Sequence, residues 1–546
     1  MKKILHKLSF FSIIFILNLV SCQKAPKYPE LKSWNTYDEK ARIDSSQQNE
    51  NQRLQYKRIQ SLVLDRNKIL NAIKIQLDDF SAEKYNELYP LIFEKSIDEI
   101  QASIDKDQLN YKLLTQWYLY RIAINESDKD LGLNAIISIN PKAVDKAEYL
   151  DSGREDKNHP IFGMPVLLKD NINTIDMPTT AGAMALQNNC TESDAYIVEN
   201  LKTNGAIILG KVNLSEWANF LCAGCPNGYS AIGGQTLNPY GRRKFDTGGS
   251  SSGSAASIAL NYAVAAVGTE TSGSILSPAS QQSLVGLKPT VQKKHQEGII
   301  PISSTLDTPG PISRTVSDNR ILYSAMFDVN LSKDDKKIEK SQFRLGAFIS
   351  LMADSLYNNA IEQLKKDGFQ IIEVEPESMD FSGFLALLNG DMKRDLKSYL
   401  NKYTADSIAV KNVADVVRFN SSDSLINIPY AQARLDGILE QDLNDQQLDL
   451  IRQKLMSSGK SYFDTVMNKH NLDAVLSINN YHAGQAAVAK YPAITVPMGF
   501  RASGEPAGLT FIAKSNQESL LYAMASTFEK MSNFREIPEI YKASIK

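Results

Sequence analysis

Short apolar runs separated by helical patterns constrain the fold of this chain more than any other feature of its sequence. Each run spans only four to seven residues and is bounded by glycine, proline or polar residues, which is typical of a buried strand and too short for a buried helix. The runs are Met164 to Leu168, Ala206 to Leu209, Ala263 to Val267, Phe343 to Ile349, Phe369 to Val374, Ala474 to Ile478 and Leu509 to Ala513. Strands that alternate with helices in this way predict an α/β fold, with a mixed β-sheet core flanked by helices.

Helical spacing dominates the chain up to about Ile122. Apolar residues at Ile69, Ile73 and Leu77 predict a helix between positions 59 and 80. The capping box Ser96-x-x-Glu99 predicts the start of another helix, and Ser515-x-x-Glu518 predicts the start of the last one.

The change from helical spacing to short apolar runs predicts the domain layout. We expect an N-terminal helical extension over 61–94 and one large domain over 95–546. Residues 380–470 are mostly helix and loop without motifs, so we predict an insertion there that borders a substrate pocket.

Composition excludes some classes of partner. With 43% hydrophobic and 22% charged residues among 546, the chain has ample material for a large core. Its 60 basic and 62 acidic residues give a net charge of -2, so no overall field favours nucleic acid, and we expect no nucleic-acid partner.

The N-terminus is typical of an exported bacterial protein. Three lysines within the first seven residues precede an apolar run, Leu8 to Val20, that is too short to cross a bilayer comfortably. The run ends in Leu19-Val20-Ser21-Cys22, which resembles a lipobox. We therefore predict a signal peptide over 1–21, lipid modification of Cys22, a polar tether over 22–60, and an envelope protein that faces the periplasm or exterior. The alternative is an ordinary signal peptide with an incidental cysteine.

Three further cysteines, Cys190, Cys222 and Cys225, allow at most one internal disulfide. Cys222 and Cys225 have the CxxC spacing, but a structural zinc site needs four ligands and the sequence has no second such pair. A local disulfide and two free thiols both remain open. We predict neither a metal nor a cofactor.

Two stretches rich in glycine and serine are the candidate segments for a catalytic or binding site. The first, Gly248 to Ala256, continues at once into an apolar helix, which argues against a flexible linker. It lacks the Lys-Ser or Lys-Thr of a phosphate-binding loop. The second stretch is Gly268 to Ile275. Upstream, an apolar strand ends in Lys169, and a buried lysine at a strand end either reaches water or sits neutral in a site.

These segments together resemble the amidase signature family, and the similarity extends over roughly residues 95 to 535. Lys169 matches the family's lysine, Ser250 its bridging serine and Ser274 its nucleophile. Further matches are Asn213 to Asn219, Gly234 to Tyr240, Val285 to Thr290, Asp307 to Pro311 and Tyr491 to Pro497. Among the family's members, bacterial peptide amidases look most similar.

The resemblance implies an amide hydrolase. Ser274 would attack a carboxamide and form an acyl-enzyme, while Ser250, after a cis peptide bond from Gly249, would relay the proton to a neutral Lys169. The N–H groups of Thr271, Ser272, Gly273 and Ser274 would form the oxyanion hole. Lysine as the base fits a chain in which none of the five histidines falls in these motifs.

Departures from the family pattern leave the pocket shape open. Ser272, Leu276-Ser277 and Gln281 to Ser283 differ from common members of the family, although none of these changes removes a catalytic group. Small-molecule and peptide amides are the expected substrates. The alternatives are a glutaminase-type subunit of an amidotransferase, or an inactive binding lipoprotein that kept the fold.

Overall fold

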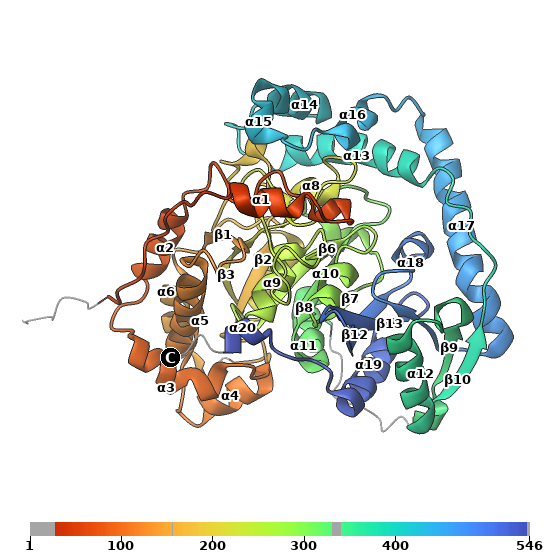
Figure 1. Ribbon diagram of the computed structural model, residues 1–546, viewed down its shortest axis with the longest axis horizontal. Coiled ribbons are helices and arrows are strands. Elements are labelled where there is room, and N and C mark those ends of the chain that lie inside the picture. The colour runs from red at the N-terminus through yellow and green to blue at the C-terminus, as the bar shows by residue number, and fades with distance from the viewer. Residues whose placement is uncertain (1–27, 155–156, 330–339, 543–546) are drawn as a thin grey trace, which may run out of the picture.

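One large mixed sheet forms the centre of the molecule (Figure 1). The computed structural model describes residues 28–154, 157–329 and 340–542. Within these ranges the sheet has eleven strands in the order β1-β3-β2-β6-β8-β7-β12-β13-β11-β9-β10. The strands are β1 (Ile136–Ile139), β2 (Pro165–Lys169), β3 (Ile207–Val212), β6 (Ala265–Glu270), β7 (Val285–Lys288), β8 (Thr308–Ser313), β9 (Arg344–Phe348), β10 (Gln370–Val374), β11 (Ala474–Ile478), β12 (Ala493–Phe500) and β13 (Pro506–Ile512), and a separate small pair is formed by β4 (Tyr229–Ser230) and β5 (Gly234–Gln235).

Helices flank this sheet. Those before and within its first half are α1 (Lys40–Ser46), α2 (Arg66–Lys74), α3 (Ala82–Ile92), α4 (Ile97–Asp105), α5 (Tyr111–Glu126), α6 (Ala143–Ser152), α7 (Tyr196–Thr203), α8 (Glu216–Asn219), α9 (Ser252–Ala259), α10 (Leu276–Gln281) and α11 (Val316–Phe327). The later ones are α12 (Ser355–Lys366), α13 (Phe384–Lys402), α14 (Val413–Ser422), α15 (Ser424–Asn427), α16 (Ala433–Leu439), α17 (Asp445–His470), α18 (Ala483–Ala489), α19 (Glu518–Ser532) and α20 (Glu539–Lys542).

The pairing directions confirm the predicted α/β class with a mixed sheet. Strand β2 pairs in parallel with β3 and β6, whereas β8, β7, β12 and β13 continue the sheet by antiparallel pairing. All seven predicted apolar runs overlap a strand, but β1, β7, β8 and β12 were not among them. Strand β8 shows the reason, since Thr308-Pro-Gly-Pro-Ile-Ser is buried throughout yet contains residues that ordinarily interrupt a strand.

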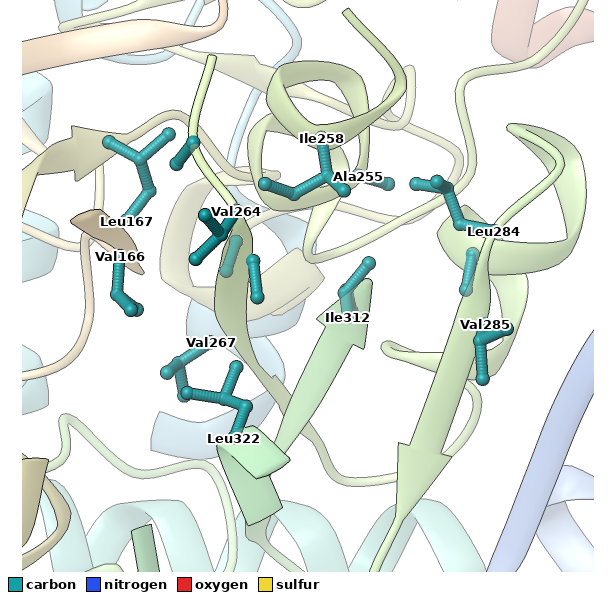
Figure 2. Close-up of a cluster of buried hydrophobic side chains, with 14 of the residues drawn as sticks. Val166, Leu167, Ala255, Ile258, Val264, Val267, Leu284, Val285, Ile312 and Leu322 are labelled. Atoms are coloured by element: carbon teal, nitrogen blue, oxygen red, sulfur yellow. The ribbon is translucent and has the colours of Figure 1, made fainter. Parts of the chain in front are cut away.

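The core lies on both faces of the sheet. Figure 2 shows Ala255 and Ile258 of α9 on one side of β6 and β8, with Leu322 of α11 beside Val267 on the other. All of these side chains are fully buried. The strands that carry the candidate site residues are therefore held rigidly from both sides.

The helix starts were predicted with mixed success. The capping box at Ser96 is present at the start of α4. The one predicted at Ser515 is wrong, because α19 begins at Glu518 and its N-cap, Gln517, makes no side-chain cap. Helix α2 covers only the middle of the helix predicted between 59 and 80, and Leu77 is buried beyond its end.

The N-terminal segment corrects part of the predicted tether. Residues 1–21 and Cys22 lie outside the described residues. From Leu31 onward the segment 22–60 is not free but lies on the domain. Leu31 and Trp34 pack against the main core, and Leu54, Tyr56 and Ile59 are buried. These apolar residues are too sparse to form a periodic pattern. They are held by contacts to distant parts of the chain, such as the Ile59 carbonyl, which accepts from the Gln235 N–H at 2.9 Å.

The region 380–470 is helical, as expected, and forms α13 to α16 across the top of the molecule and α17 down its right side in Figure 1. Its apolar side chains share a core with loops of the main domain. Leu387 and Leu455, for example, belong to the same buried cluster as Trp217, Cys222 and Ile302. Among the described residues no helix is both long and apolar enough to cross a membrane.

Candidate active site

Lys169 lies at the end of β2, a strand buried along its whole length between β3 and β6. Its side chain is completely buried. The amine Nζ lies 2.7 Å from Ser250 Oγ, 3.0 Å from Ser251 Oγ, and 2.9 and 3.1 Å from the hydroxyl and carbonyl oxygens of Thr269. The parallel neighbours of β2 thus bring the lysine and the first Gly-Ser stretch together.

Burial lowers the pKa of Lys169 to about 7, although the carboxylates of Asp307 and Glu270 act in the opposite direction. A neutral amine has two donors and one lone pair. It can therefore donate to the oxygens of Thr269 and accept a proton from the Ser250 hydroxyl. This is the property that a general base requires.

Ser250 lies in a tight turn before α9, after the cis Gly249–Ser250 peptide bond. The conformation of this turn requires glycine at positions 248 and 249. Gly248 has a φ of +69°, and a Cβ atom on Gly249 would lie 2.6 Å from Ser215 Oγ. The Ser250 carbonyl accepts from the Ser215 N–H at 3.1 Å, which fixes the turn against the segment after β3.

Ser274 lies directly beside this turn, because its carbonyl accepts from the Ser251 N–H at 3.1 Å. Its side chain differs from those of Ser250 and Ser251 in its hydrogen bonding. Among the described residues, Ser274 Oγ has no hydrogen-bond partner, and the residue keeps 8% exposure. A hydroxyl that is not engaged in a hydrogen bond within the protein is available to act as a nucleophile.

The loop from Thr271 to Ser274 has backbone N–H groups that the protein leaves unpaired within the described residues. In the described part of the chain the four N–H groups of Thr271, Ser272, Gly273 and Ser274 donate to no protein acceptor. Gly273 has a φ of +87°, and a Cβ there would come within 2.9 Å of Asn480 Nδ2. The loop is closed by Glu270, whose Oε2 accepts from the N–H groups of Ile275 and Leu276. N–H groups without a protein acceptor can stabilise a developing oxyanion if they face it.

Comparison with known proteins decides the family. The sequence model described as Amidase matches residues 113–483 of this chain. The chain belongs to the amidase signature family. A probable amidase of Arabidopsis thaliana is 33% identical over 482 residues, which cover 82% of this chain and 92% of the plant protein.

Solved structures agree with this assignment. An amidase family protein from Bacillus anthracis str. Ames has a TM-score of 0.81 at 34% identity, covering 88% of this chain and all of that one. The native peptide amidase from Stenotrophomonas maltophilia has a TM-score of 0.74 at 34% identity, covering 82% of this chain and 98% of that one. The protein is therefore an amidase, a hydrolase that acts on C–N bonds of amides, and its similarity to peptide amidases is confirmed.

Three residues of this amidase site were not predicted from the sequence. Ser251 and Thr269 contact the Lys169 amine directly, and Asn171 Nδ2 donates to Thr269 Oγ1 at 3.0 Å. All three lie inside the quoted motifs or next to them. The motifs are visible in the sequence, but a linear sequence does not show which of several neighbouring hydroxyls points at the lysine.

The cysteines resolve one open alternative. Cys222 and Cys225 form a disulfide, while Cys190 is an exposed free thiol. The disulfide closes a loop that shares a buried cluster with Trp217 and with helices α13, α14, α16 and α17. No group of His, Cys, Asp and Glu suited to a metal ion occurs among the described residues.

Proposed function

We propose that this amidase cleaves a carboxamide through a triad of Ser274, Ser250 and Lys169 and an acyl-enzyme intermediate. The observation that carries the proposal is the environment of Lys169. Its amine is fully buried and surrounded by hydroxyl and carbonyl oxygens, and no ion pair within the described ranges includes it. Because burial lowers its pKa to about 7, such a lysine is neutral in a large fraction of molecules near pH 7 and can act as a base.

The proposed reaction has two halves. Ser274 Oγ attacks the amide carbon while its proton passes to Ser250, whose own proton passes to Lys169. The resulting oxyanion is stabilised by the N–H groups of Thr271 to Ser274. Collapse breaks the C–N bond, and the proton returns through Ser250 to the leaving ammonia or amine. A water molecule then attacks the acyl-enzyme by the same proton route, which releases the carboxylic acid and restores Ser274.

The substrate class that we propose is a terminal carboxamide on an amino-acid or peptide-like acyl group. Support comes from the peptide amidase of Stenotrophomonas maltophilia, which shares 34% identity across nearly its whole length. We expect broad tolerance among acyl groups, since each methylene in a hydrophobic pocket contributes only about 1–3 kcal/mol to discrimination.

A substrate panel with a nucleophile variant tests the proposal. Wild type and Ser274→Ala would be incubated with N-blocked peptide amides, simple aliphatic and aromatic amides and free glutamine, and ammonia would be measured. We expect turnover of peptide amides by wild type alone. Substantial activity of Ser274→Ala would refute the triad, and turnover of glutamine alone would favour the glutaminase alternative. Failure of the wild type to react with any amide or serine-directed acylating reagent would favour the binding lipoprotein.

We also propose that Cys22 carries a lipid that anchors the enzyme in the cell envelope. The proposal rests on the Leu19-Val20-Ser21-Cys22 sequence and on the near-neutral net charge of -2, which gives no electrostatic reason for membrane binding. Cys22→Ala should move the exported protein from the membrane fraction to the soluble fraction. An exported Cys22→Ala protein that still sedimented with membranes after a salt wash would show that another element anchors it.

A further inference from the structure

The side chain of Thr271, in the loop with the free N–H groups, is tied to a buried carboxylate. Its hydroxyl donates to Asp307 Oδ1 at 2.6 Å. The other oxygen of Asp307 accepts from the N–H groups of Ile302 and Ser303 at 2.8 and 2.9 Å. Asp307 thus connects the proposed oxyanion loop to the segment before β8, which runs from Ile302 to Thr305.

This segment is in turn held by helices α13 and α17 of the region 380–470. Asp391 of α13 is fully buried, and its Oδ2 accepts from the Ser303 hydroxyl at 2.6 Å. Its Oδ1 accepts from two arginines, Arg394 of α13 at 2.9 Å and Arg452 of α17 at 3.0 Å. The carboxylate is therefore compensated on both oxygens, which gives the contact a fixed geometry.

Two more contacts join the same partners. The Ser304 N–H donates to Asp395 Oδ2 at 2.7 Å, and Arg452 Nε donates to Thr305 Oγ1 at 2.8 Å. Helices α13 and α17, which lie at the top and at the right side of the molecule in Figure 1, thus hold three consecutive residues of one loop. No comparable set of contacts is needed simply to cover the apolar core, because the helices already share a buried cluster with Ile302 and Leu306.

We infer that helices α13 and α17 position the oxyanion loop through the hydrogen-bonded chain Asp391, Ser303, Asp307 and Thr271. The inference rests on the proposed function, since it assigns these four residues a positioning role for the amide-cleaving loop. None of them is taken to touch the substrate through its side chain. The physical reason is that catalysis depends on loop geometry, and a misplacement of about 1 Å can lower a rate roughly 100-fold.

The chain can be cut at two points without removing a buried charge. Thr271→Val removes the hydroxyl at the catalytic end, and Ser303→Ala removes the link to Asp391 but leaves the Ser303 N–H on Asp307. We expect kcat to fall about 30-fold for Thr271→Val and about 5-fold for Ser303→Ala, with KM within about 2-fold of wild type, since the interaction acts in the transition state. The double variant should be no slower than Thr271→Val alone, because both changes break one chain.

The assay would use a benzyloxycarbonyl dipeptide amide with ammonia detection. The burst of 4-nitrophenolate from 4-nitrophenyl acetate would count active sites, so that kcat refers to folded enzyme. Ser304→Ala is the matched control, because its hydroxyl only accepts from Arg394 at 3.0 Å and its backbone contact to Asp395 remains. It should keep wild-type kcat. Thr271→Ser, which keeps a hydroxyl that can donate to Asp307, should recover part of the kcat that Thr271→Val loses.

Several results would overturn the inference. Independent, multiplying effects of Thr271→Val and Ser303→Ala would show that the two residues do not act through one chain. A fall in kcat for Ser304→Ala as large as that for Ser303→Ala would show that any loop change has the same effect. If Ser274→Ala is inactive while Ser303→Ala matches wild type, only this inference fails. If Ser274→Ala remains active, the proposed function itself fails.

Discussion

Two buried lysines on neighbouring parallel strands differ in their hydrogen-bond and ion-pair partners. Lys169 ends β2 and Lys211 lies near the end of β3, and neither side chain is exposed. The register pairs Lys211 with Leu168, one residue before Lys169, so the two amines leave opposite faces of the sheet. Lys211 Nζ lies 3.5 Å from Asp170 Oδ1 and also donates to the Ile172 carbonyl and the Thr179 hydroxyl. In the described part of the chain, Lys169 has only hydroxyl and carbonyl oxygens within hydrogen-bond reach.

Hydrogen-bond and ion-pair partners distinguish the lysine suited to act as a base, whereas burial alone does not. Burial lowers the pKa of both lysines, to about 7 for Lys169 and about 8 for Lys211. In Lys211 the adjacent Asp170 opposes the shift and forms an ion pair, which favours the charged amine. The amine of Lys169 faces serine hydroxyls and can exchange a proton with them. Lys211 is therefore suited to a structural role and Lys169 to catalysis.

The largest expected difference is in activity. Lys169→Met should lower kcat/KM about 10⁴-fold or more, because removing one member of a catalytic unit costs nearly as much as removing all of it. Lys211→Met should retain activity in the fraction that folds. Both variants would be assayed on a peptide amide with folded enzyme quantified by circular dichroism. Equal losses per folded molecule would contradict the division of roles between the two lysines.

The second difference is in stability, where we expect Lys211→Met to have the larger effect and Lys169→Met the smaller. Lys211→Met leaves the fully buried Asp170 without its ion-pair partner, which should cost about 3–5 kcal/mol of unfolding free energy at pH 7. Lys169→Met removes no carboxylate partner and should cost far less, measured by urea unfolding. The double variant Lys211→Met with Asp170→Leu is the control and should recover part of the loss. A stable Lys211→Met protein would show that the ion pair is not needed.

The sequence indicates the role of Lys169 far better than that of Lys211. Lys169, Ser250 and Ser274 lie in motifs, so their proximity is predicted from the sequence alone. Nothing in the sequence around Lys211 indicates its pairing, because Asp170 is its partner only through the strand register. Contacts set by register or by a loop 36 residues away, such as Thr271 with Asp307, require the tertiary structure.

The same limit applies to the fold. The apolar runs predicted most strands, because burial on both faces leaves a direct compositional trace. They missed β8, whose prolines and glycine hide it, and they missed the docked part of the N-terminal segment. Leu54, Tyr56 and Ile59 are buried there without helical or strand periodicity. A segment that is stabilised by isolated side chains against a preformed surface has no local pattern to detect.

The third prediction concerns pH and again separates the two lysines. If a neutral Lys169 is the base, kcat/KM should rise with pH below about 7 and level off above it, because protonation removes the base. The charged groups that raise the pKa of Lys169 are Asp307 and Glu270. Burial raises the pKa of Asp307 itself to about 7, so this carboxyl is charged mainly in the upper part of the limb. Asp307→Asn removes that charge and should therefore move the acidic limb to lower pH, while also lowering the plateau.

Lys211→Met should leave the position of that limb unchanged, because Lys211 lies on the other face of the sheet and is not among the groups that shift the pKa of Lys169. The measurement is a kcat/KM profile from about pH 5 to 9 for the three proteins, at about 0.1 M ionic strength so that exposed charges are screened. If the limb moved with Lys211→Met but not with Asp307→Asn, the titrating group would be Lys211 and the assignment to Lys169 would be wrong.

The smallest expected effects come from two matched threonines. Thr269 Oγ1 lies 2.9 Å from the Lys169 amine, and Thr179 Oγ1 lies 2.8 Å from the Lys211 amine. Both hydroxyls are buried, and valine preserves the shape of each side chain. Thr179→Val removes a hydrogen bond to a charged group and should cost about 1.5–3 kcal/mol of stability with unchanged kcat per folded enzyme. Thr269→Val removes one of several oxygens that orient a neutral amine, so it should lower kcat about 5-fold and change stability less. Urea unfolding and amide turnover of the two variants, measured side by side, give the answer. If Thr179→Val slowed turnover and Thr269→Val did not, the roles of the two lysines would have to be exchanged.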